Sequence, residues 1–229
     1  MYKNVIFDLD GTLLNTREDL AAAVNWVCAR HGWPAHGVEE YKYFVGNGAP
    51  KLLERVVPPE VEITEELRRV TLEEFTERYN AHKEDKTTVY PGMPEAVRQL
   101  REAGLTLAVL SNKPHDAAFP VVERYYPGVF HAVQGALPGV PVKPDPTLLY
   151  RLMGELGAAV DDTLFVGDSN VDIRTAKSGG LAGCGVLWGF RTRQELESEG
   201  ADYIVRTPEE LTDLILTGVQ HENPTSHAK

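Results

Sequence analysis

Short apolar runs alternate with longer segments of helical period over most of this chain. Val5, Ile6 and Phe7 form a run without a polar member, which is typical of a strand buried inside a sheet. After residue 89 the two patterns alternate. Strands are expected at 105–110, 130–133, 163–166, 183–188 and 203–205, and helices at 93–103, from Pro114 with a break or kink at Pro120, and at 146–156, 171–178 and 208–216. This order predicts a parallel α/β sheet built from right-handed βαβ units.

Residues 16–86 show helical periodicity and no convincing strand pattern. Thr16 followed by Asp19 resembles a capping box at a helix start, and Gly32 can end that helix. Further helices are expected at 38–44, 49–57 and 64–83. A helical block therefore interrupts the α/β domain near its beginning. The expected organisation is an α/β core of residues 1–15 and 87–220, a helical domain of residues 16–86, and a disordered tail at 221–229.

Composition limits the partners and the location. The 229 residues are 42% hydrophobic, which allows a sizeable core, and Cys28 and Cys184 are expected to be buried free thiols. A net charge of −11 argues against nucleic acid as a partner but is compatible with a small anionic substrate. Without a signal-peptide pattern or an apolar run of transmembrane length, the protein is expected in the cytoplasm and away from membranes. The sequence does not separate a monomer from a homodimer.

Polar residues follow three of the expected strands and precede one helix. Because the carboxyl ends of parallel strands meet at one edge of a sheet, these residues are expected to share a cleft. The set comprises Asp8 and Asp10 after the first strand, Ser111 and Asn112 after the second, Lys143 ahead of 146–156, and Asp168 and Asp172 after 163–166. Singly, each has a structural alternative, such as a strand-end turn, a solvated loop lysine or a helix cap. Their joint order and chemical type favour a catalytic site.

These residue types suit phosphoryl transfer. An ionised Asp8 can attack a phosphate ester, and a protonated Asp10 can protonate the leaving group. Mg²⁺ prefers oxygen ligands and is expected between the carboxylates of Asp8 and Asp168, where it offsets their repulsion of the substrate. Lys143 and the Ser111 hydroxyl can hold phosphate oxygens. A carboxylate one helical turn further on, Asp172, can orient either Lys143 or a metal-bound water without itself binding the metal.

Four groups of residues resemble the motifs of the haloacid dehalogenase superfamily, and the resemblance extends over essentially residues 1–216. These groups are Asp8–Thr12, Ser111–Asn112, Lys143 and Gly167–Asp172. The resemblance implies a Rossmann-like core with a mobile helical cap inserted after the first motif. It also implies that Asp8 becomes an aspartyl phosphate and that Asp10 acts as acid and then as base. Mg²⁺ would be bound by the Asp8 side chain, the main-chain carbonyl of Asp10 and Asp168. Because dehalogenases lack the carboxylate that matches Asp10, the chain is similar to the phosphotransfer branch.

Finer features resemble the phosphoglycolate phosphatases, namely Val45–Ala49, Ser111–Pro114 and Lys143–Pro146. The resemblance implies that Ser111, Asn112 and Lys143 bind the phosphate. It further implies that the glycine turn in the cap selects the leaving group, with Asn47, Gly48 and Lys51 as specificity residues. Either Lys51 or Lys113 would meet a substrate carboxylate. The structural alternatives are a plain interhelical turn and, for Lys51, a solvated helix face. Arg191 is a further candidate anion contact, although a surface position is the more expected for it.

The sequence therefore predicts a Mg²⁺-dependent phosphatase acting on a small phosphorylated metabolite, with 2-phosphoglycolate as the first choice. A phosphosugar mutase is the main alternative, because a cap that excludes water would pass the phosphoryl group to a sugar hydroxyl. A pyrophosphatase or a phosphonatase on the same fold is a second alternative, the latter needing a Schiff-base lysine such as Lys51. A non-catalytic binding protein is disfavoured, because Asp8, Asp10, Lys143 and Asp168 are all present.

Overall fold

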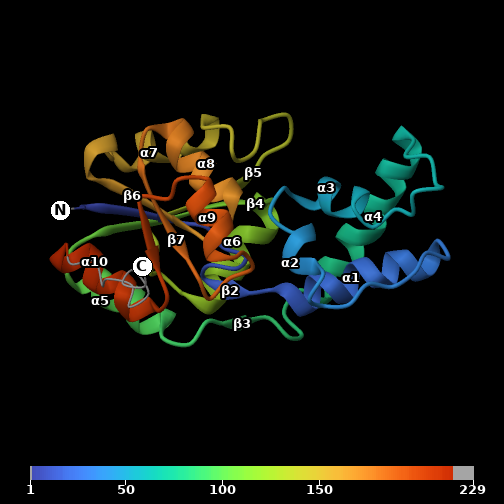
Figure 1. Ribbon diagram of the computed structural model, residues 1–229, viewed down its shortest axis with the longest axis horizontal. Helices are drawn as coiled ribbons and strands as arrows, with labels where there is room; N and C mark the ends of the chain where they lie inside the picture. The colour runs from blue at the N-terminus through green and yellow to red at the C-terminus, as the bar shows by residue number, and fades with distance from the viewer. Residues whose placement is uncertain (1, 219–229) are drawn as a thin grey trace, which may run out of the picture.

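Six parallel strands form the centre of the larger of two lobes, in the order β5-β4-β1-β6-β7-β8 (Figure 1). The structure is a computed structural model and describes residues 2–218. The strands are β1 (Asn4–Phe7), β4 (Thr106–Pro114), β5 (Ala132–Ala136), β6 (Thr163–Gly167), β7 (Ala182–Val186) and β8 (Tyr203–Val205). Each neighbouring pair is parallel. The predicted fold class, an α/β protein with a Rossmann-like parallel sheet and an inserted helical region, is confirmed.

Helices cover both faces of this sheet (Figure 1). One face is covered by α5 (Met93–Glu102), α6 (His115–Tyr125) and α10 (Pro208–Thr217), and the other by α7 (Thr147–Leu156) and α8 (Asn170–Gly179), with α9 (Arg193–Ser198) packed against α8. Alternation along β1 explains the two layers, since Val5 and Phe7 pack on the first face and Ile6 on the second. Burial of one such side chain stabilises the fold by roughly 1.5–3 kcal/mol.

The smaller lobe is helical and consists of α1 (Arg17–Arg30), α2 (Tyr41–Phe44), α3 (Ala49–Glu54) and α4 (Glu65–His82). It lies beside the sheet lobe along the long axis of the molecule (Figure 1). It has its own apolar cluster, in which Tyr41 is fully buried and which also includes Phe190 from the sheet lobe. The two connections between the lobes pair with each other as β2 (Leu14–Asn15) and β3 (Thr88–Val89), which are antiparallel.

The predicted capping box at the start of α1 is wrong. The Thr16 side chain makes no cap hydrogen bond, and within residues 2–218 its buried hydroxyl has no hydrogen-bond partner. The buried Asp19 carboxylate instead accepts hydrogen bonds from the main-chain N–H groups of Lys86 and Thr87 and from the Thr87 hydroxyl, at 2.8 to 3.1 Å. These long-range donors outcompete the local ones and tie the two connections together at the base of the helical lobe.

Several predicted boundaries also differ from the structure. Strand β4 continues to Pro114, so Ser111 and Asn112 lie within it, and its pairing with β5 is irregular between Leu110 and Pro114. Helix α6 runs without interruption through Pro120. The proline removes only one backbone N–H donor, and burial of the helix face that holds Val121 keeps the segment helical. Helix α3 ends at Glu54, three residues early, α2 begins only at Tyr41, and α9 and the short 3₁₀ helix Val160–Asp162 were not predicted.

Two composition-based expectations can be compared with this fold. Cys28 and Cys184 are both buried and free, as predicted. Among residues 2–218 no helix combines the length and the apolar character that a bilayer crossing requires. The predicted disordered tail at 221–229 lies outside the described residues.

Candidate active site

The predicted site residues gather at the carboxyl edge of the sheet, where the strand order reverses. The chain runs from β1 to β4 and β5 on one side and then returns to β6 on the other side of β1. Such a reversal leaves a crevice at the strand ends. A cavity lies there and is bordered on the other side by the helical lobe. Its lining includes Asp8, Asp10, Ser111, Asn112, Lys113, Lys143, Asp168, Ser169, Asp172 and Arg191 from the sheet lobe, and Leu20, Gly46, Gly48, Leu52 and Phe75 from the helical lobe.

Lys143 is the central cation of this site. Its Nζ donates to Asp8 Oδ1 at 2.7 Å and to Asp172 Oδ1 at 2.7 Å. The Lys143 side chain is only 3% exposed, which rules out the solvated-loop alternative. Burial alone would lower the pKa of Lys143, but the two carboxylates outweigh it and raise the pKa above its ordinary value. The ammonium group therefore stays charged and holds Asp8 in place.

Asp172 is held by the start of α8. Its Oδ2 accepts hydrogen bonds from the Ser169 N–H at 3.0 Å and from the Ser169 hydroxyl at 2.7 Å. With Oδ1 on Lys143, both oxygens are engaged. The backbone packs so closely here that a Cβ on Gly167 would lie 2.2 Å from the Asp172 Cβ. A glycine before Asp168 is therefore required for this arrangement.

Asp168 reaches the site from the end of β6 and is held by two donors. The Phe190 N–H donates to Oδ2 at 2.7 Å, and the Thr12 hydroxyl lies 3.5 Å from Oδ1. Gly11 turns beneath this carboxylate with a φ of 96°, and a Cβ there would lie 2.4 Å from Asp168 Oδ2. The glycine after Asp10 thus permits both the left-handed turn and the close approach of Asp168.

The buried carboxylates of Asp8, Asp168 and Asp172 have too little positive charge around them. One oxygen of each lies within 4.8 Å of the others. Burial raises the pKa of Asp8 to about 7, with Lys143 opposing this effect and Asp172 adding to it. Burial and the neighbouring Asp172 and Asp8 carboxylates raise the pKa of Asp168 well above its ordinary value. A hard divalent cation with oxygen ligands fits this donor set, because it would stabilise the ionised carboxylates. Asp172 is the poorer donor, because Lys143 and Ser169 hold its oxygens with three hydrogen bonds of 2.7 to 3.0 Å, whereas Asp168 Oδ1 has only the Thr12 hydroxyl at 3.5 Å.

Asp10 points to a second buried lysine. The Lys113 Nζ lies 3.0 Å from both Asp10 oxygens and donates to the Tyr79 hydroxyl of α4 at 2.8 Å. It also lies 4.7 Å from the centre of the Tyr79 ring. Lys113 therefore meets a carboxylate of the protein itself, and through Tyr79 it links the sheet lobe to the helical lobe.

The side chains of Ser111 and Asn112 differ in whether a hydrogen-bonding group remains available to a ligand. The buried Ser111 hydroxyl accepts from the Lys113 N–H at 3.2 Å and lines the cavity, so its own proton is available to a ligand. The Asn112 amide group donates to the carbonyls of Gly46 and Lys143, and its oxygen accepts from the Lys143 N–H. The Asn112 side chain thus positions Lys143 and the Gly46 turn. Only main-chain groups of Asn112 are then left to bind a phosphate.

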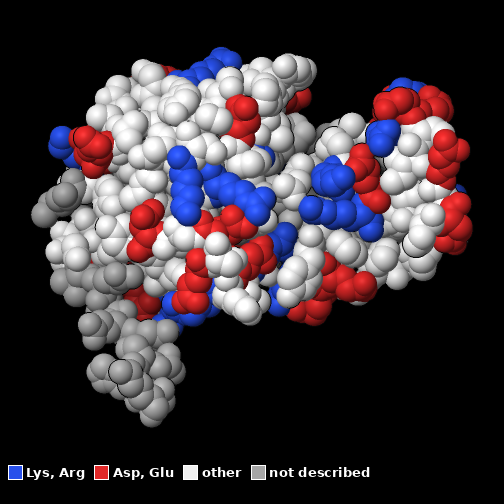
Figure 2. Space-filling model, turned by 45° about the horizontal axis from the view of Figure 1, so that its top comes forward, with Lys and Arg blue, Asp and Glu red and all other residues white. Residues whose placement is uncertain are grey.

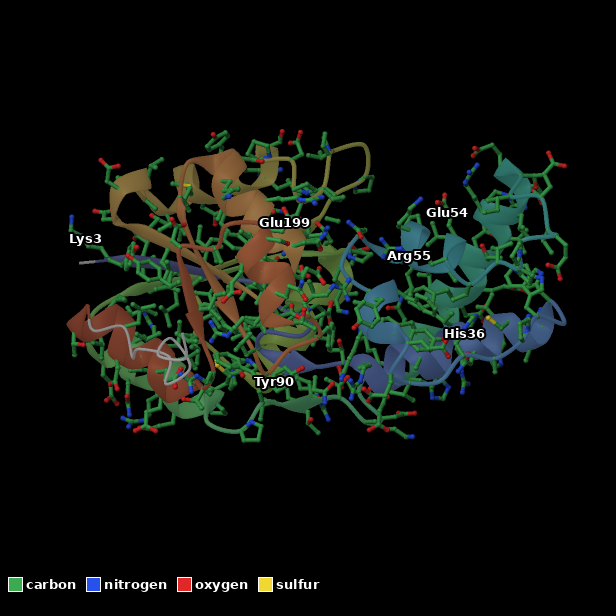
Figure 3. The ribbon with its side chains drawn as sticks, viewed as in Figure 1. Lys3, His36, Glu54, Arg55, Tyr90 and Glu199 are labelled. Carbon is green, nitrogen blue, oxygen red and sulfur yellow. The ribbon has the colours of Figure 1, made fainter. Side chains whose placement is uncertain are left out.

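The predicted specificity residues are not brought together. Gly48 lines the cavity, but Asn47 is not among the lining residues, and its oxygen accepts from Arg55, labelled in Figure 3, at 2.7 Å. The Lys51 side chain is 55% exposed and pairs with Glu54 outside the cavity. The solvated-helix alternative for Lys51 therefore describes the structure better than a substrate contact.

Arg191, by contrast, is more buried than expected. A surface position was expected for it, yet it is 8% exposed and lines the cavity. The backbone explains its burial. The preceding Phe190 packs into the apolar cluster of the helical lobe, which carries Arg191 into the junction between the lobes.

Comparison with known proteins places this site in a family. Residues 5–186 match the haloacid dehalogenase-like hydrolases. The chain belongs to this family. It is 34% identical to the phosphoglycolate phosphatase of Pseudomonas savastanoi pv. phaseolicola over 207 residues. The aligned segment covers 89% of this chain and 76% of that protein. It is 31% identical to the phosphoglycolate phosphatase of Vibrio parahaemolyticus, over 93% of this chain and 96% of that protein.

The fold of this hydrolase is shared as well. The crystal structure of a protein from Lactobacillus delbrueckii subsp. bulgaricus, provisionally described as a phosphoglycolate phosphatase, superposes with a TM-score of 0.87 at 33% identity. The match covers 94% of this chain and 99% of that one. The expectation of an enzyme of the haloacid dehalogenase-like hydrolase family is therefore confirmed.

Two contacts of this hydrolase site were not predicted from the sequence, and Arg191 was only a secondary candidate. The pairing of Lys113 with Asp10 joins residues 103 positions apart, and no local pattern carries it. The sequence indicated the burial of Arg191 only weakly, through the neighbouring apolar residue Phe190, which a plain surface loop does not need. Tyr79 was seen only as an apolar position of a helix, whereas its hydroxyl contacts Lys113.

Proposed function

We propose that the protein is a Mg²⁺-dependent phosphatase that hydrolyses a small phosphomonoester, with 2-phosphoglycolate as the preferred substrate, through an aspartyl phosphate on Asp8. The observation that carries the proposal is the contact of the buried Lys143 ammonium with Asp8 and Asp172 at 2.7 Å each. It fixes one carboxylate at the cavity and supplies a positive charge where a phosphate would bind. The phosphoglycolate phosphatases among the relatives support the choice of substrate.

Each residue has a defined part in the proposed reaction. An Asp8 oxygen forms a bond to phosphorus while the bond from phosphorus to the leaving oxygen breaks, and Asp10 gives its proton to that oxygen. A water molecule then attacks phosphorus, Asp10 takes a proton from it, and the bond from phosphorus to Asp8 breaks. Lys143 and the Ser111 hydroxyl hold the phosphoryl oxygens through both steps.

The metal would be held by Asp8 and Asp168, with the main-chain carbonyl of Asp10 as a further ligand. When bound, Mg²⁺ would offset the negative charge of the carboxylates and of the phosphoryl group. Lys143 and Asp172 remain a separate pair in this proposal, because Lys143 holds Asp172 Oδ1 and Ser169 holds Asp172 Oδ2.

In this proposal residues 16–86 act as a cap on the core of residues 1–15 and 87–220. The cap covers the cavity with Leu20, Leu52 and Phe75, which would keep bulk water from the phosphoryl group. Figure 2 shows Lys and Arg side chains on both sides of the junction between the lobes, with Asp and Glu side chains beside them. The positive charge available to a small anionic substrate is therefore that of the cavity lining, where Lys113, Lys143 and Arg191 lie. We expect the enzyme to act on a cytoplasmic metabolite.

Purified protein with a panel of phosphoesters tests the proposal. Phosphate release from 2-phosphoglycolate should require Mg²⁺, should stop with EDTA, and should be lost in Asp8→Asn. A parallel incubation with a sugar 1-phosphate distinguishes the mutase alternative, because formation of the sugar 6-phosphate without free phosphate would identify a mutase. Good turnover by Asp8→Asn would contradict the proposed nucleophile.

A further inference from the structure

Arg191 is a buried cation in the active-site cavity that the proposed reaction does not use. It follows β7 in the loop that begins at Leu187, and its side chain is 6% exposed. It lines the same cavity as Asp8, Ser111 and Lys143. Because a phosphate held by Ser111 and Lys143 would lie in this cavity, Arg191 borders the space that the remainder of a small substrate must occupy.

The donors of Arg191 are only partly engaged. Its Nη2 donates to the Val45 carbonyl at 2.9 Å and lies 3.5 Å from the Tyr43 carbonyl, and its Nε pairs with Glu195 at 3.1 Å. Its Nη1 is buried and has no hydrogen-bond partner in the part of the chain that the structure describes. Leaving a buried donor of a charged group unpaired costs about 1–3 kcal/mol or more, so a missing acceptor is indicated.

The two lysines of the cavity already have partners, and the proposed reaction assigns the third N–H of Lys143 to the phosphoryl group. Lys143 is shared between Asp8 and Asp172, and Lys113 is shared between Asp10 and Tyr79. Arg191 thus has a buried, unpaired N–H group that the proposed reaction does not use. A planar guanidinium is well suited to a carboxylate, because its N–H groups match the spacing of the two carboxylate oxygens.

We propose that Arg191 binds a second anionic group of the substrate, a carboxylate attached close to the phosphoester oxygen, and so selects phosphorylated hydroxy acids over phosphoesters that carry no second anionic group. This inference rests on the proposed function and assigns its substrate selectivity to one residue. In 2-phosphoglycolate one methylene group separates the ester oxygen from the carboxylate. An anion that short can engage the phosphate subsite and Arg191 together only if both face one cavity, as they do here.

A comparison of two esters tests the proposal. The first is 2-phosphoglycolate, and the second is 2-hydroxyethyl phosphate, in which a hydroxymethyl group replaces the carboxylate. The measured quantity is the ratio of kcat/KM for the first ester to kcat/KM for the second. Loss of a charge-assisted hydrogen bond is worth about 1.5–3 kcal/mol, so Arg191→Met should lower this ratio by about 10- to 100-fold. Arg191→Lys keeps the charge but not the planar geometry, and its ratio should fall between those of the wild type and Arg191→Met.

Arg55 provides the matched control. It donates to the Phe44 carbonyl at 2.6 Å and to the Tyr43 carbonyl at 3.3 Å, so it supports the same turn of the helical lobe, but it does not line the cavity. Arg55→Met should leave the ratio within about threefold of the wild-type value. If Arg191→Met lowers kcat/KM for both esters equally, Arg191 only supports the turn and the proposal is overturned. A wild-type protein that hydrolyses neither ester would instead contradict the proposed function itself, and the role of Arg191 would fall with it.

Discussion

The Nζ of Lys113 lies 3.0 Å from both carboxylate oxygens of Asp10, and its side chain is 4% exposed. A buried pair of this kind fixes the position of its carboxylate, which the proposed proton transfers require. We predict that Lys113→Met lowers kcat for 2-phosphoglycolate by about 10- to 100-fold, the cost of a misplaced catalytic group. Steady-state kinetics measure this directly.

Lys51 supplies the control for that substitution. Its ammonium pairs with Glu54 on the exposed face of α3, and exposed pairs contribute about 0–1 kcal/mol. Lys51→Met should therefore keep kcat and KM within about twofold of the wild type. A large rise in KM for Lys51→Met would instead restore Lys51 as a specificity residue and show that the lobes rearrange on binding.

Metal binding should stabilise the fold. The buried carboxylates of Asp8 and Asp168 repel each other, and a divalent cation that binds only the folded state removes that repulsion. At a hundredfold excess over Kd the stabilisation is about 2.7 kcal/mol, which for a chain of this size raises Tm by roughly 5–10 °C. Thermal unfolding with Mg²⁺ and with EDTA measures the shift. The shift should largely vanish in Asp168→Asn, and an equal shift in that variant would place the metal elsewhere.

Gly167 has no room for a side chain. A Cβ at this position would lie 2.2 Å from the Asp172 Cβ and 2.3 Å from its Cγ, so Gly167→Ala must displace Asp172 and with it Lys143. We expect a loss of about 1–3 kcal/mol in the free energy of unfolding, together with loss of activity. Denaturant titration and phosphate release report the two effects.

Gly154→Ala is the matched control, because Gly154 lies in α7 and a Cβ there would meet nothing within 4 Å beyond the backbone of its own helix. A helix-interior alanine is favoured over glycine by roughly 0.5–1 kcal/mol, so this variant should be slightly more stable and fully active. Equal behaviour of the two alanine variants would show that the close approach at Gly167 is not what fixes Asp172.

The base of the helical lobe depends on Asp19. Its carboxylate accepts three hydrogen bonds from Thr87 and Lys86, and Asp19→Ala would leave these donors unpaired. The expected loss is about 3 kcal/mol in the free energy of unfolding. Glu18→Ala removes a neighbouring carboxylate that forms only an exposed pair, so its effect should stay within about 0.5 kcal/mol. Similar losses for both variants would show that Asp19 does not tie the two connections together.

Local patterns were sufficient to find the strands of the parallel sheet, although not all of their bounds. The apolar run Val5–Phe7 forms β1, and Asp8, Ser111 and Asp168 reach one cavity because parallel strands place their carboxyl ends at one edge. The alternation of apolar runs and helical segments is enough to locate the strands, because each strand is specified by its own residues.

Interactions between distant segments could not be predicted in the same way. The partner of Asp19 is 68 positions away at Thr87, and the partner of Asp10 is 103 positions away at Lys113. The position of Arg191 depends on how one lobe lies against the other. Such contacts are decided by the packing of whole elements. A capping box was therefore expected at Thr16, whose hydroxyl has no hydrogen-bond partner within residues 2–218, and a surface position was expected for Arg191, which is buried at the cavity.

The central claim is that phosphoryl transfer passes through Asp8, and trapping the intermediate tests it most directly. Asp10→Asn should still accept a phosphoryl group from 4-nitrophenyl phosphate, whose leaving group needs no proton, but should release it slowly because water is no longer activated. Acid quench followed by peptide mass spectrometry should find one phosphoryl group per chain on Asp8, together with a stoichiometric burst of 4-nitrophenolate. No burst and no label, or a label on any other residue, would contradict the account.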